Sequence, residues 1–202
     1  MPALRWVGMS RAIFITGLVA LGMGLANGQQ GKSLGSPQAP IHIDLYSDYQ
    51  CPACKLLHDQ TLAPLISDYV KTGKVYLVHH EFPLPMHSHA REAACLACAA
   101  EKLGKYERVG DQLFLTQETW AGSGDVVGAA CSVLDASDAK KLRELAATPE
   151  IKSEVDNDIR AGQAEKVNAT PTMIITKLVQ RYPVVGPVSY PVLRKFLDSL
   201  LD

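Results

Sequence analysis

The chain has 202 residues, of which 47% are hydrophobic and 20% are charged, and its formal net charge is -1. This composition is typical of a globular protein with one apolar core, and it excludes a disordered or fibrous chain. The charge balance argues against nucleic acid as the main partner, because no basic excess is available to neutralise phosphates.

The first 28 residues have the pattern of a secretory signal peptide. Arg5 and Arg11 precede an uncharged run over residues 12–26, and small residues follow at Ala26-Asn27-Gly28. A basic start, an apolar stretch of about 7–15 residues and small residues at the cleavage point are typical of such signals. The run is short for a membrane span of about 20 residues, although an uncleaved anchor is the alternative. We therefore expect residues 1–28 to direct export to the periplasm or another extracytoplasmic compartment, where disulfides persist.

A linker and the beginning of a βαβ unit are predicted next. Residues 29–40 are rich in Gly, Gln, Ser and Pro and predict a linker. Ile41–Tyr46 alternates apolar and polar residues, which predicts a strand. Apolar residues recur at helical spacing from Lys55 to Val70, and Val75–Val78 predicts a second strand. A strand, a Cys-x-x-Cys motif, a helix and a strand in this order begin a βαβ unit.

In the second half of the chain, the predicted secondary structure changes from strands to helices and then back to strands. Between about residues 88 and 164, alanine-rich and amphipathic stretches predict several helices. Strand patterns return at Thr172–Thr176 and Gln180–Val185, and an apolar helical face runs from Tyr190 to Leu201. We therefore expect residues 41–202 to form one α/β domain, with a helical insertion between the two halves of its sheet.

The sequence Cys51-Pro52-Ala53-Cys54 is the candidate redox centre. A Cys at a helix N-terminus is stabilised as the thiolate by unpaired N–H groups and the helix dipole, and Pro52 suits the first helical turn. We expect Cys51 to form the mixed disulfide and Cys54 to resolve it. Because Ala53 brings no side-chain donor, the motif predicts a less oxidising couple than the strongest oxidases have, unless residues distant in sequence compensate. A structural disulfide and half of a metal site are the alternatives.

A second motif, Thr170-Pro171-Thr172, lies directly before a predicted strand. Together with Ser47–Cys54 (SDYQCPAC) and the helical insertion, it resembles the DsbA-like oxidoreductases of thioredoxin-like fold. The resemblance extends from about Gly35 to the C-terminus. It implies a cis Pro171 beside the Cys-x-x-Cys motif and a Thr170 backbone that pairs with an extended substrate.

The acid that assists proton transfer is less clearly placed. Members of the DsbA-like family often carry an acidic residue six positions before the first Cys, where this chain has Leu45. Asp44 is the candidate for that role, although strand alternation places it on the opposite face from Leu45. Asp48, which we expect in an exposed loop, is a second candidate.

The remaining cysteines lie in the predicted insertion. Cys95 and Cys98 are three residues apart on one helix face, so an oxidising compartment favours a disulfide from one of them to Cys131. Buried free thiols and a redox relay are the alternatives. With five cysteines in the chain, one stays unpaired.

Four histidines, His79, His80, His87 and His89, lie close together in the sequence. Their spacing does not match a helical pair of metal ligands, and we interpret them as surface histidines around a loop. We expect no metal and no cofactor.

The sequence thus predicts an exported thiol:disulfide oxidoreductase that exchanges disulfides with exported protein or peptide thiols. The family resemblance implies an oxidase that a membrane redox partner re-oxidises. A thioredoxin-like reductase and a metal-binding thioredoxin-like chaperone are the alternatives. An isomerase usually needs a second site or a dimerisation domain, and we see no spare segment for one.

Overall fold

The computed structural model describes Met1 and residues 31–202. The predicted signal peptide therefore lies, apart from Met1, outside the described residues. Within the described part of the chain, no helix is both long enough and apolar enough to cross a membrane.

The centre of the molecule is a five-stranded sheet with the strand order β1-β3-β2-β4-β5. Strands β2 and β3 are parallel, and the other neighbouring pairs are antiparallel. The strands are β1 (Ser33–Leu34), β2 (Ile41–Ser47), β3 (Val75–Glu81), β4 (Thr172–Lys177) and β5 (Gln180–Val185). The alternation predicted for β2 is present, because Ile41, Ile43 and Leu45 are all buried on one face.

That face of the sheet is covered by the helix after the Cys-x-x-Cys motif and by the C-terminal helix α9 (Tyr190–Leu201). The first of these is continuous from Pro52 to Val70, but two turns of it are π-helical. Its parts are α1 (Pro52–Leu57), η1 (His58–Leu62), α2 (Ala63–Leu65) and η2 (Ile66–Val70). Pro64 lies within it and has no N–H to donate, which favours a locally widened turn.

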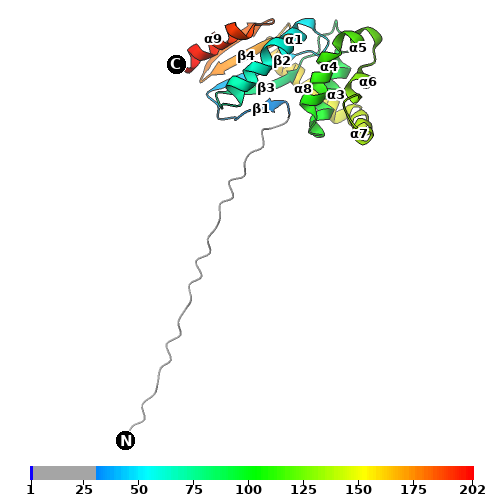
Figure 1. Cartoon of the computed structure of the whole chain (residues 1–202), viewed down its shortest axis with the longest axis horizontal. Coiled ribbons are helices and arrows are strands. Elements are labelled where there is room, and N and C mark those ends of the chain that lie inside the picture. The colour runs from blue at the N-terminus through cyan, green and yellow to red at the C-terminus, as the bar shows by residue number, and fades with distance from the viewer. Residues whose placement is uncertain (2–30) are drawn as a thin grey trace.

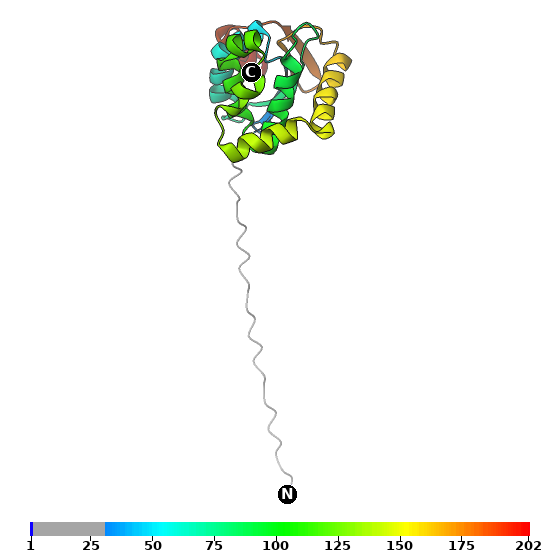
Figure 2. The same cartoon turned by 90° about the vertical axis from the view of Figure 1, so that its right-hand side faces the viewer.

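The predicted helical insertion is present between β3 and β4. Its helices are α3 (Ala90–Lys102), α4 (Tyr106–Leu115), α5 (Gln117–Ser123), α6 (Val126–Cys131), α7 (Ala136–Ala146) and α8 (Pro149–Ala164). They gather at the end of the molecule opposite α9 (Figure 1), and from that end they stand in front of the sheet (Figure 2). The α/β fold with helices inserted between the halves of the sheet is thereby confirmed.

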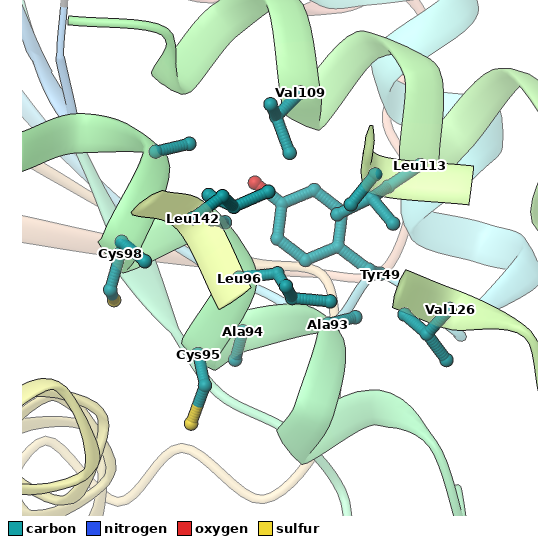
Figure 3. Packing of buried hydrophobic residues seen from close by; sticks show 14 of the residues in the cluster. Tyr49, Ala93, Ala94, Cys95, Leu96, Cys98, Val109, Leu113, Val126 and Leu142 are labelled. Atoms are coloured by element: carbon teal, nitrogen blue, oxygen red, sulfur yellow. The ribbon is translucent and has the colours of Figure 1, made fainter. Parts of the chain in front are cut away.

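The core of the insertion reaches the redox motif through Tyr49. The Tyr49 ring lies among Leu96, Val109 and Leu113, so the loop before Cys51 is anchored in the helical part of the fold (Figure 3). Gly110 faces the hydroxyl of Tyr49, where a Cβ atom would come within 3.1 Å.

Two sequence predictions need correction. The linker predicted over residues 29–40 is wrong for residues 31–40, because Lys32 and Ala39 are buried and β1 adds an edge strand to β3. A two-residue strand is too short to produce a visible alternation. The second strand was predicted to end at Val78, but β3 continues to Glu81, so His79 and His80 lie on a strand and not in a loop.

Candidate active site

Cys51 caps the N-terminus of α1. Its backbone is extended, with φ -77° and ψ 120°, and its carbonyl oxygen accepts hydrogen bonds from the N–H groups of Cys54 and Lys55, both at 3.1 Å. Pro52 takes the first helical position. Cys51 is buried, but 7% of its surface remains exposed.

Cys54 lies one helical turn further on and is 1% exposed. Its sulfur accepts a hydrogen bond from the N–H of Asp48 at 3.4 Å. The outer cysteine can therefore meet a substrate sulfur, whereas the inner one is placed to react within the pair. The structure describes both as free thiols.

The Thr170–Pro171 peptide bond is cis, as the resemblance implied. This loop lies against the redox motif, since the sulfur of Cys51 lies 3.4 Å from the carbonyl oxygen of Thr170. Thr170 is 7% exposed, and its hydroxyl has no hydrogen-bond partner among the described residues. The two motifs that the sequence singled out therefore form one site.

The electrostatics of the pair separate the two thiols. A hydrogen bond from the Cys54 thiol lowers the pKa of Cys51 to about 5, helped by Thr170 and by the N–H groups of Cys54 and Ala53 and opposed by burial. Burial raises the pKa of Cys54, and the neighbouring Cys51 raises it further. Ala53 contributes through its backbone, and Thr170 is a donor distant in sequence. At neutral pH the reduced site therefore holds one thiolate, on Cys51.

Gln117 at the start of α5 was not found from the sequence. Its Nε2 donates to the carbonyl oxygens of Tyr49 at 2.6 Å and Cys51 at 3.1 Å, and the side chain is 4% exposed. It therefore fixes the active-site loop to the helical insertion. A single Gln in a helical stretch has no neighbouring pattern that marks this role.

The comparisons with known proteins agree with this geometry. The family model described as Thioredoxin matches residues 28–198. The chain belongs to the thioredoxin family.

Within this family, the chain is similar to DsbA-type proteins. The structure of α-DsbA1 from Wolbachia pipientis has a TM-score of 0.70 and 21% identity, covering 84% of this chain and 89% of that one. Oxidised BdbD from Bacillus subtilis has a TM-score of 0.68 and 21% identity, covering 86% and 96% of the two chains. Disulfide bond formation protein D of Bacillus subtilis is 23% identical over 157 residues, which are 72% of this chain and 68% of the relative. The resemblance to DsbA-like proteins is confirmed.

In this thioredoxin-family protein, Asp44 lies on the face of the sheet that strand alternation predicted, whereas Asp48 does not lie where the sequence suggested. Asp44 accepts a hydrogen bond from His80 Nε2 at 2.9 Å, whereas Leu45 is buried against the helix of the redox motif on the other face of the sheet. The predicted role of Asp44 in proton transfer gains no support from the described contacts. Asp48 is not in an exposed loop, as predicted, but is 1% exposed.

An ionic network lies on the face of the sheet opposite Leu45. His80 Nδ1 contacts Asp158 at 3.2 Å, and Lys32 pairs with the same carboxylate. Burial opposes the charge on His80, but hydrogen bonds to Asp158 and Asp44 outweigh it and raise its pKa to about 9. Burial raises the pKa of Glu81, which accepts a hydrogen bond from a tyrosine hydroxyl, to about 8. This network links α8 to the sheet.

The other three cysteines are buried free thiols, so the expected disulfide to Cys131 is not formed and the alternative of buried free thiols holds. Their sulfurs face different partners: Cys98 lies 3.7 Å from Lys32 Nζ, and Cys131 lies 3.8 Å from the carbonyl oxygen of Ala139. Figure 3 shows the sulfur of Cys95 pointing away from the Tyr49 ring.

The four histidines do not converge on one point. His79 lies edge-on to Tyr106, with ring centroids 6.0 Å apart, and burial lowers its pKa to about 4. His80 binds two aspartates, His87 binds Asp48, and His89 precedes α3. Among the described residues, no group of three or more His, Cys, Asp or Glu side chains is arranged to hold a metal ion.

Proposed function

We propose that this protein is an exported thiol:disulfide oxidoreductase that donates the Cys51–Cys54 disulfide to protein or peptide thiols. The observation that carries the proposal is the asymmetry of the pair. Cys51 is a stabilised thiolate with 7% of its surface exposed, and Cys54 is a thiol one turn away with 1% exposed. A couple whose reduced form is stabilised in this way is an oxidant.

In the oxidising direction, a substrate thiolate attacks the sulfur of Cys51. The Cys51–Cys54 bond breaks, a mixed disulfide forms, and Cys54 leaves as a thiolate that takes up a proton. A second substrate thiolate then attacks the substrate sulfur of the mixed disulfide, which releases Cys51 as its stabilised thiolate. Two electrons pass from substrate to protein, and a disulfide partner, which the resemblance suggests is membrane-bound, must remove them.

The roles of the neighbouring residues follow from their positions. Pro52 begins α1, and the backbone N–H of Ala53 supports the thiolate. The hydroxyl of Thr170 also lowers the pKa of Cys51, and the cis Thr170–Pro171 bond lies in the loop that contacts the Cys51 sulfur. The backbone of Thr170 is the surface on which an extended substrate would pair.

Export is part of the proposal and is supported by residues 1–28 as read from the sequence. It is tested by N-terminal sequencing of the protein recovered from an exporting host. A new N-terminus near residue 29 supports cleavage, and an intact Met1 in the membrane fraction supports the anchor.

The direction of the reaction is tested by the midpoint potential of the pair. The purified protein is equilibrated in glutathione buffers, and free thiols are counted by alkylation and mass spectrometry. We expect a midpoint towards about -120 mV, the strong-oxidase end of the scale. A midpoint near about -270 mV would overturn the oxidase proposal and indicate a reductase. Cys131→Ser is the control, because that thiol lies outside the site and should leave the midpoint unchanged.

A further inference from the structure

The carboxylate of Asp48 is buried beside the active-site loop and accepts three hydrogen bonds. Its Oδ1 accepts from the N–H of Gln50 at 2.7 Å. Its Oδ2 accepts from the N–H of Leu84 at 2.8 Å and from Nδ1 of His87 at 2.7 Å. The side chain of Asp48 is fully buried and that of His87 is 20% exposed, so the pair joins the interior to the surface.

The main chain of the same residue reaches both cysteines. The N–H of Asp48 donates to the sulfur of Cys54 at 3.4 Å, and its carbonyl oxygen accepts from the N–H of Cys51 at 3.1 Å. Any rotation of the Asp48 backbone therefore moves the donor to Cys54 and the start of α1 together.

The partners of the Asp48 side chain belong to a second segment, residues 82–89, between β3 and α3. This segment is tied to the active-site loop at both ends. The N–H of Phe82 donates to the carbonyl oxygen of Ser47 at 2.8 Å, and the N–H of His89 donates to Oε1 of Gln50 at 2.8 Å. Asp48 lies between these two contacts, and its carboxylate joins the active-site loop to residues 82–89 a third time.

We infer that Asp48 and His87 are positioning residues that set the redox equilibrium of Cys51 and Cys54 by fixing the sulfur of Cys54. The inference rests on the proposed function of that pair. The thiol of Cys54 is the largest support of the Cys51 thiolate, so its sulfur must stay where its S–H reaches Cys51. The Asp48 N–H holds that sulfur, and the carboxylate holds the Asp48 backbone.

Removing the His87 donor takes away one of the three hydrogen bonds that hold the Asp48 carboxylate, so the Asp48 N–H holds the sulfur of Cys54 less firmly. The Cys51 thiolate then loses support, the reduced form becomes less stable, and the couple becomes less oxidising. A purely structural role predicts a loss of folding stability with no change in the equilibrium between dithiol and disulfide, because both redox forms would be affected alike.

The test compares three single variants of the full chain with the wild type. His87→Leu removes the Nδ1 donor, and His87→Asn keeps an N–H donor near the same place. His42→Leu is the matched control, because His42 lies at the far end of β2, where it packs edge-on against Tyr76. The equilibrium constant with glutathione is measured for each by alkylation, and thermal unfolding is followed in parallel.

We expect His87→Leu to change the equilibrium constant by about fivefold in favour of the disulfide form, which corresponds to about 20 mV. His87→Asn and His42→Leu should stay within about twofold of the wild type. Asp48→Asn should shift the equilibrium in the same direction, because an amide in place of the carboxylate turns an NH₂ group towards one of the three donors.

A folded His87→Leu protein with the wild-type equilibrium constant would overturn the inference, as would an equal shift in His42→Leu or in His87→Asn. The proposed function fails separately, if the wild-type pair does not exchange with glutathione at all.

Discussion

The sulfur of Cys51 lies 3.4 Å from the carbonyl oxygen of Thr170, a residue 119 positions later in the chain. The contact joins the two halves of the split sheet at the reacting atom, because Cys51 follows β2 and Thr170 precedes β4. Strands β2 and β4 are antiparallel neighbours, so the end of one and the start of the other meet at the same edge. The redox centre is thus a product of the sheet topology as much as of the Cys-x-x-Cys motif.

The thiolate of Cys51 should form at about pH 5 in the reduced protein. Thiolate absorbance or the rate of alkylation against pH measures this midpoint. Cys54→Ala removes the largest support and should raise the midpoint by about one unit or more, whereas Cys54→Ser keeps a donor and should raise it less. Equal midpoints in the two variants would show that the Cys54 donor does not act on Cys51.

The same shift makes the stability of the reduced protein depend on pH. The pKa of Cys51 is lower in the fold than in the unfolded chain, so the stabilisation is fully present above about pH 8.5 and is lost as the pH falls towards 5. Urea unfolding of the reduced and oxidised forms at several pH values measures this effect. The free energy of unfolding of the reduced form should fall relative to that of the oxidised form as the pH is lowered over this range. A difference between the two forms that does not change with pH would contradict the expectation.

The hydroxyl of Thr170 is buried and has no hydrogen-bond partner among the described residues, and it lowers the pKa of the Cys51 thiol. Thr170→Val keeps the shape and removes the donor. We expect the equilibrium constant with glutathione to move about tenfold towards the disulfide form, or about 30 mV, with no loss of stability in the oxidised protein. Thr170→Ser restores the donor and should behave as the wild type. A loss of stability in the oxidised Thr170→Val protein would indicate a packing effect instead.

The parts of this site that depend on a local pattern could be predicted from the sequence. The alternation from Ile41 to Tyr46, the Cys-x-x-Cys motif and the Thr170-Pro171-Thr172 motif all depend on neighbours in the chain, and all were found. The site also needs Gln117 and the inward-facing carboxylate of Asp48, whose partners lie 66 and 36 residues away. Only the folded arrangement of α5 and of residues 82–89 shows what these side chains bind.

The partner of Asp44 was missed for the same reason. Strand alternation correctly separated it from Leu45, but the sequence could not show that His80 on the neighbouring strand would bind it. Lys32 lies in a stretch whose composition predicts a linker, so its ion pair with Asp158 in α8 could not be predicted. Long-range ion pairs leave no periodic signal, so their members look like ordinary surface charges.

The bridge from His80 to Asp44 and Asp158 should make the stability of the protein fall at alkaline pH. The pKa of His80 is raised to about 9, so its contribution is complete below about pH 6.5 and is lost as the pH rises through 9. In the oxidised protein, His80→Gln should cost about 3 kcal/mol at pH 6 and much less at pH 9.5. Taking the difference in stability between the wild type and the variant removes the pH dependence of groups that both proteins share, such as Glu81, whose raised pKa also makes the stability fall as the pH rises. A constant difference across this range would contradict the role of the charge.

Gly162 sets how closely α8 approaches the sheet. A Cβ atom there would lie 2.5 Å from Cε2 of Phe82 and 3.0 Å from Cδ1 of Tyr46, both of which are buried. Gly162→Ala should therefore destabilise the protein by about 1–3 kcal/mol, because a close-packed contact must open. Gly122 in α5 has no atom within 4 Å of such a Cβ, so Gly122→Ala should be neutral or stabilising by up to about 1 kcal/mol.

Urea unfolding of both alanine variants measures the two effects under the same conditions. Adding Phe82→Leu to Gly162→Ala makes room for the new methyl group, so the double variant should lose less stability than the sum of the two single changes. Equal costs at Gly162 and Gly122, or strict additivity in the double variant, would mean that the ring of Phe82 does not limit the approach of α8.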